Sequence, residues 1–165
     1  MRCGGCDGGR LADSSSAALE NVSPAAVPLA LCIAIRLNAL AFSLFWSAAF
    51  MVLLLGVDLG PWLTPLIRWG AHGDEYAMML CSLYIPWGVY LWRAATQPLR
   101  HKLLIDFTVV ANAGHYGLMT LMAFVIPGAH THLLGDVLLG WLGLLPLLLT
   151  WLPYRWRMRN AEAAA

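Results

Sequence analysis

His115 lies near the middle of a long apolar stretch, and Asn112 precedes it by three positions. Residues three apart share one face of a helix. A polar group at membrane depth is costly, so it is a functional candidate that usually faces the protein interior. We take His115 and Asn112 as a candidate site for a cofactor (haem or quinone) or for a proton relay. The alternative is an interhelical hydrogen bond that fixes the bundle register, with Ser43 and Ser47 as expected receivers.

Two features of the sequence bear on haem binding and catalysis. A bis-histidine haem within one subunit would need a second histidine at similar depth, and the other apolar stretches offer none. The sequence also lacks a glycine-rich phosphate loop, a nucleophile elbow and paired carboxylates within one apolar stretch. No catalytic residue is therefore predicted, and the cofactor stays unknown.

A second group of candidate ligands surrounds the start of the last apolar stretch. His132 and Asp136 are four residues apart and share a helical face, and His130 is close by. His72 and Glu75 precede another apolar stretch on the same expected side of the membrane. Imidazole and carboxylate groups suit Zn, Cu or Fe. The spacing matches no defined metal signature, so a hydrogen-bonded interfacial cluster is the alternative.

Asp106 and the N-terminal cysteine pair have simpler expected roles. Asp106 is close to the end of its apolar stretch, near Arg100, Lys102 and Arg93, where we expect either an interfacial ion pair or a charge that satisfies free amides at the helix N-terminus. Cys3 and Cys6 form one Cys-x-x-Cys pair, whereas a structural zinc takes four ligands. A metal or redox role for this pair is therefore not favoured.

The composition identifies the environment in which these residues act. The chain has 165 residues, of which 60% are hydrophobic and 12% are charged. Soluble domains carry about a quarter charged residues. The net charge of +1 argues against a nucleic-acid partner. The fold class predicted is therefore an all-α integral membrane protein in contact with the lipid bilayer.

Four apolar stretches have the length of about 20 residues that a helix needs to cross a bilayer. A flexible polar tail (1–24) and an interfacial apolar segment (25–36) are expected before them, and a basic tail (153–165) after them. The four apolar stretches together predict a four-helix bundle within a membrane domain at 37–152. Its spans are expected at 37–57, 76–95, 103–126 and 132–152.

Lysine and arginine positions predict the orientation of these spans. Cytoplasmic loops carry an excess of these residues. One side would hold seven of them, and the other side only Arg68 together with Asp58, Asp74 and Glu75. The cationic side holds Arg36, Arg93, Arg100, Lys102, Arg155, Arg157 and Arg159. Four spans place both termini on this side, which is predicted to be cytoplasmic.

Several short motifs between Tyr76 and Leu152 carry a family resemblance. They are Arg93-Ala94-Ala95 with Pro98, Leu104-Ile105-Asp106-Phe107-Thr108, His115, and His132-Leu133-Leu134-Gly135-Asp136. On these residues the chain resembles an uncharacterised family of small bacterial four-helix integral membrane proteins. The resemblance implies a four-span bundle of unknown activity. It provides no catalytic residues.

The leading functional expectation is a non-enzymatic accessory or structural subunit of a larger bacterial inner-membrane complex, with other membrane subunits as partners. A respiratory or photosynthetic complex is one possible host. The alternative is a cofactor-binding redox membrane protein that uses His115, or His132 with Asp136. A weaker alternative is a path for small solutes or protons along Asn112 and His115.

Overall fold

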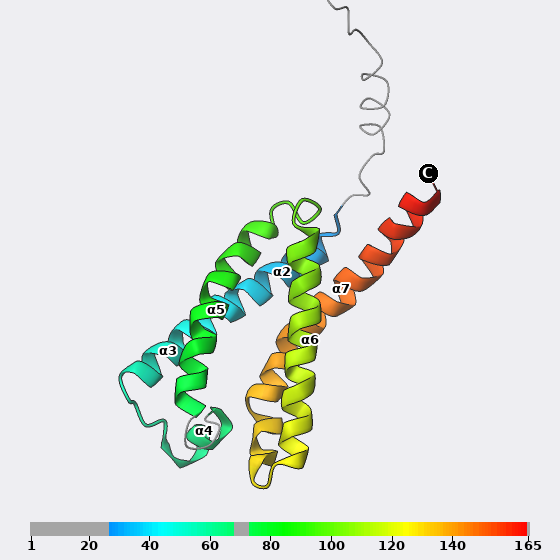
Figure 1. Ribbon diagram of the computed structural model, residues 1–165. Coiled ribbons are helices and arrows are strands. Elements are labelled where there is room, and N and C mark those ends of the chain that lie inside the picture. Colours follow the sequence, from blue (N-terminus) through cyan, green and yellow to red (C-terminus); the bar gives the residue numbers. More distant parts are fainter. Residues whose placement is uncertain (1–26, 68–72, 165) are drawn as a thin grey trace, which may run out of the picture.

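The computed structural model describes residues 27–67 and 73–164, and its elements there are all helical (Figure 1). The all-α class is confirmed for these residues. The tail 1–24, with Cys3 and Cys6, and His72 lie outside the described residues. In order, the elements are α2 (Leu29–Leu40), the π-helix η1 (Ala41–Phe45), α3 (Trp46–Leu54), α4 (Gly60–Ile67), α5 (Gly73–Ala94), α6 (Lys102–Val125), the 3-10 helix η2 (Ala129–Leu134) and α7 (Asp136–Ala164).

Three helical stretches of the described chain are long and apolar enough to cross a membrane. They are Leu29–Leu54, Lys102–Val125 and Ala129–Ala164, and they indicate a multi-pass membrane protein. Helix α5 has 22 residues but is not among these three. Asp74 and Glu75 are in its first turn, and Arg93 is in its last turn. The helix also contains five tyrosines and tryptophans.

The first helical stretch passes Arg36 without interruption. Residues 29–54 contain neither glycine nor proline, so nothing in the local sequence ends the helix at the expected boundary. Arg36 is accommodated on the helix surface, where its guanidinium lies 5.5 Å from the centre of the Trp92 ring. Leu31 and Ile35 are fully buried against the other helices. From Leu29 onward, the segment expected at 25–36 is thus part of the packed bundle.

The helices are arranged so that α5 runs back along α2 and α3, while α6 and α7 form an adjacent antiparallel pair (Figure 1). Helix α2 also packs against α7. Four helices therefore meet at the end of the bundle where α5 turns into α6. We call the buried cluster at this end the apolar core; it contains Leu31, Ile35, Ala39, Leu91, Ala95, Ile105, Val109, Leu147, Trp151 and Tyr154.

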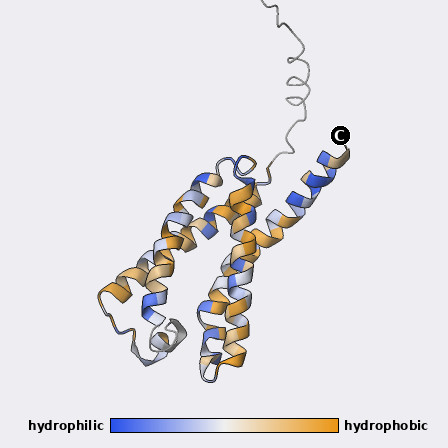
Figure 2. Ribbon diagram, in the orientation of Figure 1, coloured by the Kyte–Doolittle hydropathy of each residue, from blue (hydrophilic) through white to orange (hydrophobic). Residues whose placement is uncertain are grey.

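Helix α7 continues well beyond the expected end of the last span. The segment expected as a basic tail, 153–165, is helical as far as Ala164. Figure 2 shows hydrophobic residues along much of the long helices and hydrophilic residues near the C-terminal end of α7. Large apolar side chains are exposed on every long helix, which is compatible with contact to lipid. The start of α2 and the end of α7 lie toward the same end of the bundle (Figure 1).

Candidate functional site

Stacked aromatic rings cross the bundle at mid-length. The ring centroids of Trp46 and Tyr84 are 4.7 Å apart, and those of Tyr84 and Trp87 are 5.4 Å apart. Trp87 in turn stacks on Phe107 at 5.0 Å. These rings belong to α3, α5 and α6, so one continuous stack connects three helices. Phe42 packs edge-on against Tyr84 at 4.8 Å.

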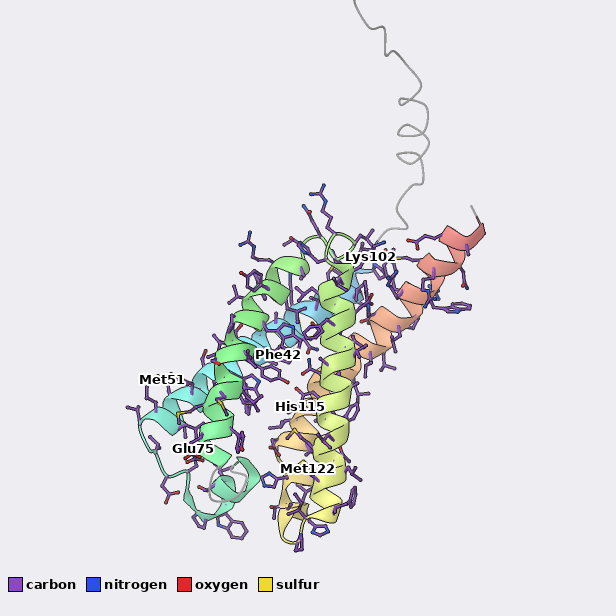
Figure 3. All side chains as sticks on the ribbon, in the orientation of Figure 1. Phe42, Met51, Glu75, Lys102, His115 and Met122 are labelled. Carbon is purple, nitrogen blue, oxygen red and sulfur yellow. The ribbon has the colours of Figure 1, made fainter. Side chains whose placement is uncertain are left out.

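Polar side chains of α6 complete this layer. We call the group of Phe42, Trp46, Tyr84, Trp87, Phe107, Thr108, Asn112 and His115 the aromatic–polar layer. The hydroxyl of Tyr84 donates to Oδ1 of Asn112 at 3.0 Å, and the indole N–H of Trp87 donates to Oγ1 of Thr108 at 2.9 Å. Both bonds join α5 to α6, and Figure 3 shows Phe42 and His115 at this level.

Asn112 is fully engaged within the protein. Its side chain is completely buried, and its amide nitrogen donates to the carbonyl of Thr108 at 2.8 Å. Its amide oxygen accepts the bond from Tyr84. Asn112 therefore makes an interhelical hydrogen bond, as in the alternative interpretation of the sequence. The expected receivers on the first helix were wrong, because the partner comes from α5.

Ser43 of the first helical stretch lies where this stretch and α5 come close together. Ser43 lies against Gly88 of α5, where a side chain would collide with the Ser43 hydroxyl and come within 2.7 Å of the carbonyl oxygen of Ala39. The missing side chain of Gly88 thus allows the two helices to approach closely. The π-helical segment η1 lies at this crossing, and Phe42 and Trp46 on either end of it both contact Tyr84.

His115 differs from Asn112, although the two share a face of α6. Its ring is half-buried, with its centroid 6.2 Å from that of Tyr84 and 5.4 Å from that of Tyr116. Within residues 27–67 and 73–164, neither ring nitrogen of His115 makes a hydrogen bond. His115 is thus the member of the predicted site whose ring nitrogens form no hydrogen bond with the described residues.

The candidate metal ligands are only partly brought together. Nδ1 of His132 lies 3.1 Å from Oδ1 of Asp136, and the same oxygen accepts a bond from the backbone N–H of Val137 at 3.0 Å. His130 is exposed, and Glu75 is exposed in the first turn of α5. Among the described residues, no three or more His, Cys, Asp or Glu side chains are grouped closely enough to hold a metal. His132 and Asp136 are thus a hydrogen-bonded pair at the start of α7.

Asp106 has other partners than expected. Its Oδ1 accepts a bond from the indole N–H of Trp151 at 2.7 Å, and its Oδ2 accepts one from Nε of Arg155 at 3.2 Å. Lys102, one of the expected partners, instead lies 3.4 Å from the carboxylate of Glu162. The reason is the length of α7, which carries its basic residues back alongside the first turns of α6.

Sequence reasoning missed the aromatic partners of the predicted site. Tyr84, Trp87 and Gly88 lie on one side of a helix by their spacing, and Thr108 and Asn112 are four residues apart on another. These spacings were a usable signal for two facing stripes. They do not by themselves indicate which helix faces which.

A family model with the description "Family of unknown function (DUF6632)" matches residues 27–152. The matched range contains the apolar core up to Trp151 and the whole aromatic–polar layer. No curated protein and no solved structure matches the chain.

Proposed function

The chain belongs to DUF6632, a family of unknown function, and from this premise we propose that it is a non-enzymatic accessory subunit of a larger bacterial inner-membrane complex. In this proposal the chain crosses the membrane four times, because α5 is a span in addition to the three apolar helical stretches. At about 1.5 Å per residue the 22 residues of α5 extend about 33 Å, enough for a hydrocarbon core of about 30 Å.

The charge distribution supports a cytoplasmic position for both termini. Arg93 ends α5, Lys102 begins α6, and Arg155 lies beside the first turns of α6. The opposite end of α5 carries Asp74 and Glu75. Cytoplasmic loops are the ones that are enriched in basic residues.

The observation that carries the proposal is the outward face of α6. Gly114, Gly117 and Leu121 recur at intervals of three and four residues, so they form one stripe, and all three are exposed. A side chain added at Gly114 or Gly117 would meet nothing within 4 Å. Membrane helices associate through small residues that let two backbones approach closely. We propose this stripe as the contact with another membrane subunit.

The interior of the bundle supports the same function. In the described chain every fully buried side-chain nitrogen or oxygen has a hydrogen-bond partner. The amide of Asn38, for example, donates to the carbonyl of Gly143, linking α2 to α7. The buried polar groups of a scaffold are expected to bond to one another in this way.

The proposal is tested by extracting native membranes in a mild detergent and analysing the tagged chain by native electrophoresis. We expect the wild-type chain to migrate in a complex much larger than 18.0 kDa. Gly117→Leu should release it from the complex, because the larger side chain keeps the partner helix away. The isolated variant should remain folded, since leucine favours a helix more than glycine does.

Ala48→Leu is the matched control, because Ala48 is a small, exposed residue on α3. This variant should stay in the complex. A wild-type chain that migrates alone would contradict the proposal. So would a complex that survives Gly117→Leu unchanged.

We also propose a second function, a cofactor-binding membrane protein, on the basis of His115 alone. A half-buried imidazole without a hydrogen bond from the described residues, next to two tyrosine rings, could bind a haem, quinone or metal together with a partner's ligand. Purified protein would then show a visible absorption band or a bound metal that His115→Ala removes. A colourless, metal-free and quinone-free sample, prepared with its native neighbours, would exclude this function.

A further inference from the structure

A cleft of about 290 Å³ lies between the first turns of α6 and the later turns of α7. It is separate from the aromatic–polar layer and from the glycines of the α6 stripe. Its lining combines charged and apolar residues: Asp106, Val109, Val110, Trp151, Leu152, Arg155 and Arg159. The volume is close to the lower limit for small-molecule sites, which is about 300 Å³.

The polar part of the cleft carries a net positive charge. Both oxygens of Asp106 already accept hydrogen bonds, one from Trp151 and one from Arg155. Arg155 uses Nε for this bond, which does not involve the two terminal nitrogens of its guanidinium. Arg159 lies one helical turn further along α7 and is exposed. The lining of the cleft thus contains two arginines and one carboxylate, which leaves one positive charge to be balanced.

The arrangement of the two arginines itself favours an anion. Like charges four residues apart on a helix repel each other. Asp106 bonds to Arg155, whereas the carboxylate of Glu162 bonds to Lys102. An anion placed between the two guanidinium groups would relieve the repulsion and receive charge-assisted hydrogen bonds from both.

The apolar part of the cleft faces the expected lipid. Val110 is 71% exposed and Leu152 is 52% exposed, whereas Trp151 is fully buried beneath them. The cleft also lies at a membrane-surface level, since Asp106 is four residues into α6 and Lys102 begins this helix. A ligand that fits must therefore be anionic at one end and apolar at the other. Basic clefts between helices at this depth are typical of anionic lipid sites.

We propose that this cleft binds an anionic phospholipid from the surrounding membrane. Its phosphodiester would lie between the guanidinium groups of Arg155 and Arg159, and an acyl chain would follow Val110 and Leu152. A zwitterionic lipid fits less well, because its ammonium group would enter a cleft whose one carboxylate is already paired. The three charged side chains that line the cleft have a net charge of +1, which one phosphodiester group would balance.

The test uses the full chain, delipidated in a nonionic detergent and titrated with phosphatidylglycerol or phosphatidylcholine, with binding followed by native mass spectrometry. We expect at least one phosphatidylglycerol to bind in preference to phosphatidylcholine. Arg159→Gln should weaken that binding about tenfold, because a charge-assisted hydrogen bond is lost. Glycerol 3-phosphate at millimolar concentration should not compete, because it lacks the acyl chains.

Two variants keep the result interpretable. Arg157→Gln removes the same charge from an exposed residue that does not line the cleft, and it should leave binding unchanged. Arg159→Lys should retain most of the preference while keeping the charge, and circular dichroism should show native helicity in all variants. Equal binding of the two lipids, or equal losses in Arg159→Gln and Arg157→Gln, would overturn the proposal. Competition by glycerol 3-phosphate would instead assign the cleft to a free phosphate ester.

Discussion

The apolar core and the aromatic–polar layer hold the same helices together in different ways. In the apolar core, aliphatic side chains of α2, α5, α6 and α7 surround Trp151, which is fully buried. In the aromatic–polar layer, stacked rings and two side-chain hydrogen bonds join α5 to α6. The backbones of α5 and α6 come close to each other at few positions. The rings and the hydrogen-bonding side chains of the layer therefore span the space between α5 and α6.

This difference shows which interactions hold the helices together in the apolar core and in the aromatic–polar layer. In a bilayer, lipid is as apolar as the core, so close packing and hydrogen bonds replace the hydrophobic effect as the cause of helix association. The apolar core can rely on packing because four helices meet there. The aromatic–polar layer relies on large rings and polar bonds, whose geometry is more specific. We therefore expect the core to supply most of the stability, and the layer to fix the register of the helices.

The largest expected effect is that of Trp151→Ala in the apolar core. The change leaves a cavity and removes the bond to Asp106, so it should lower the free energy of unfolding by about 3 to 5 kcal/mol. Unfolding in mixed detergent micelles with increasing dodecyl sulfate, followed by circular dichroism, measures this quantity.

Trp156→Ala is the matched control for this experiment. Trp156 is on the same helix and is 66% exposed, so its loss should change the free energy of unfolding by less than about 0.5 kcal/mol. If the two variants were equally stable, the apolar core would not be the main source of stability. The comparison between the two levels would then be wrong.

Gly88→Ala should have the next largest effect, at the junction between the two levels. The added methyl group would collide with Ser43 and Ala39, so the crossing of α5 over the first helix must open. We expect a loss of about 2 kcal/mol in the same unfolding assay. Gly117→Ala in the isolated chain adds a methyl group where nothing lies within 4 Å, and it should be neutral or slightly stabilising. Equal effects of the two changes would argue against a close crossing at Gly88.

A double-mutant cycle on Tyr84 and Asn112 measures how much their hydrogen bond contributes to the stability of the aromatic–polar layer. Asn112→Ala leaves the buried Tyr84 hydroxyl without its acceptor and should cost about 1 kcal/mol. Tyr84→Phe removes the stranded hydroxyl, so in that background the cost of Asn112→Ala should fall. Additive losses would show that the hydrogen bond between α5 and α6 contributes nothing of its own.

Composition and hydropathy predicted the all-α class and helices apolar enough to cross a membrane, because lipid exposure places apolar residues all around a helix. The third predicted span, 103–126, differs by one residue at each end from α6, which is Lys102–Val125. The continuation of the first helix past Arg36 was not predictable from charge alone. A single arginine can remain on a helix surface, and here the Trp92 ring lies beside it.

The candidate site was predictable only where it depends on spacing within one helix. The pairing of His132 with Asp136 and the shared face of Asn112 and His115 follow from spacings of four and three residues. The partners across helices depend on helix order, crossing angle and length. The bond between Asp106 and Arg155, for example, requires α7 to remain helical beyond Leu152. A hydropathy pattern that ends at Leu152 does not contain that information.

The smallest expected effect on stability is that of His115→Phe, and it separates the two residues that the sequence grouped together. Because the described residues form no hydrogen bond with the His115 ring, replacing it with a ring of similar shape should change the free energy of unfolding of the isolated chain by less than about 0.5 kcal/mol. Asn112→Leu, which keeps the volume but removes the bond to Tyr84, is the matched change one turn away and should cost more. Both variants are measured in the isolated chain and again in the complex extracted from membranes. If His115→Phe is silent in isolation but destabilises the complex, His115 serves a neighbouring molecule. If it costs as much as Asn112→Leu in isolation, the imidazole is a structural member of the layer, and the contrast between the two residues fails.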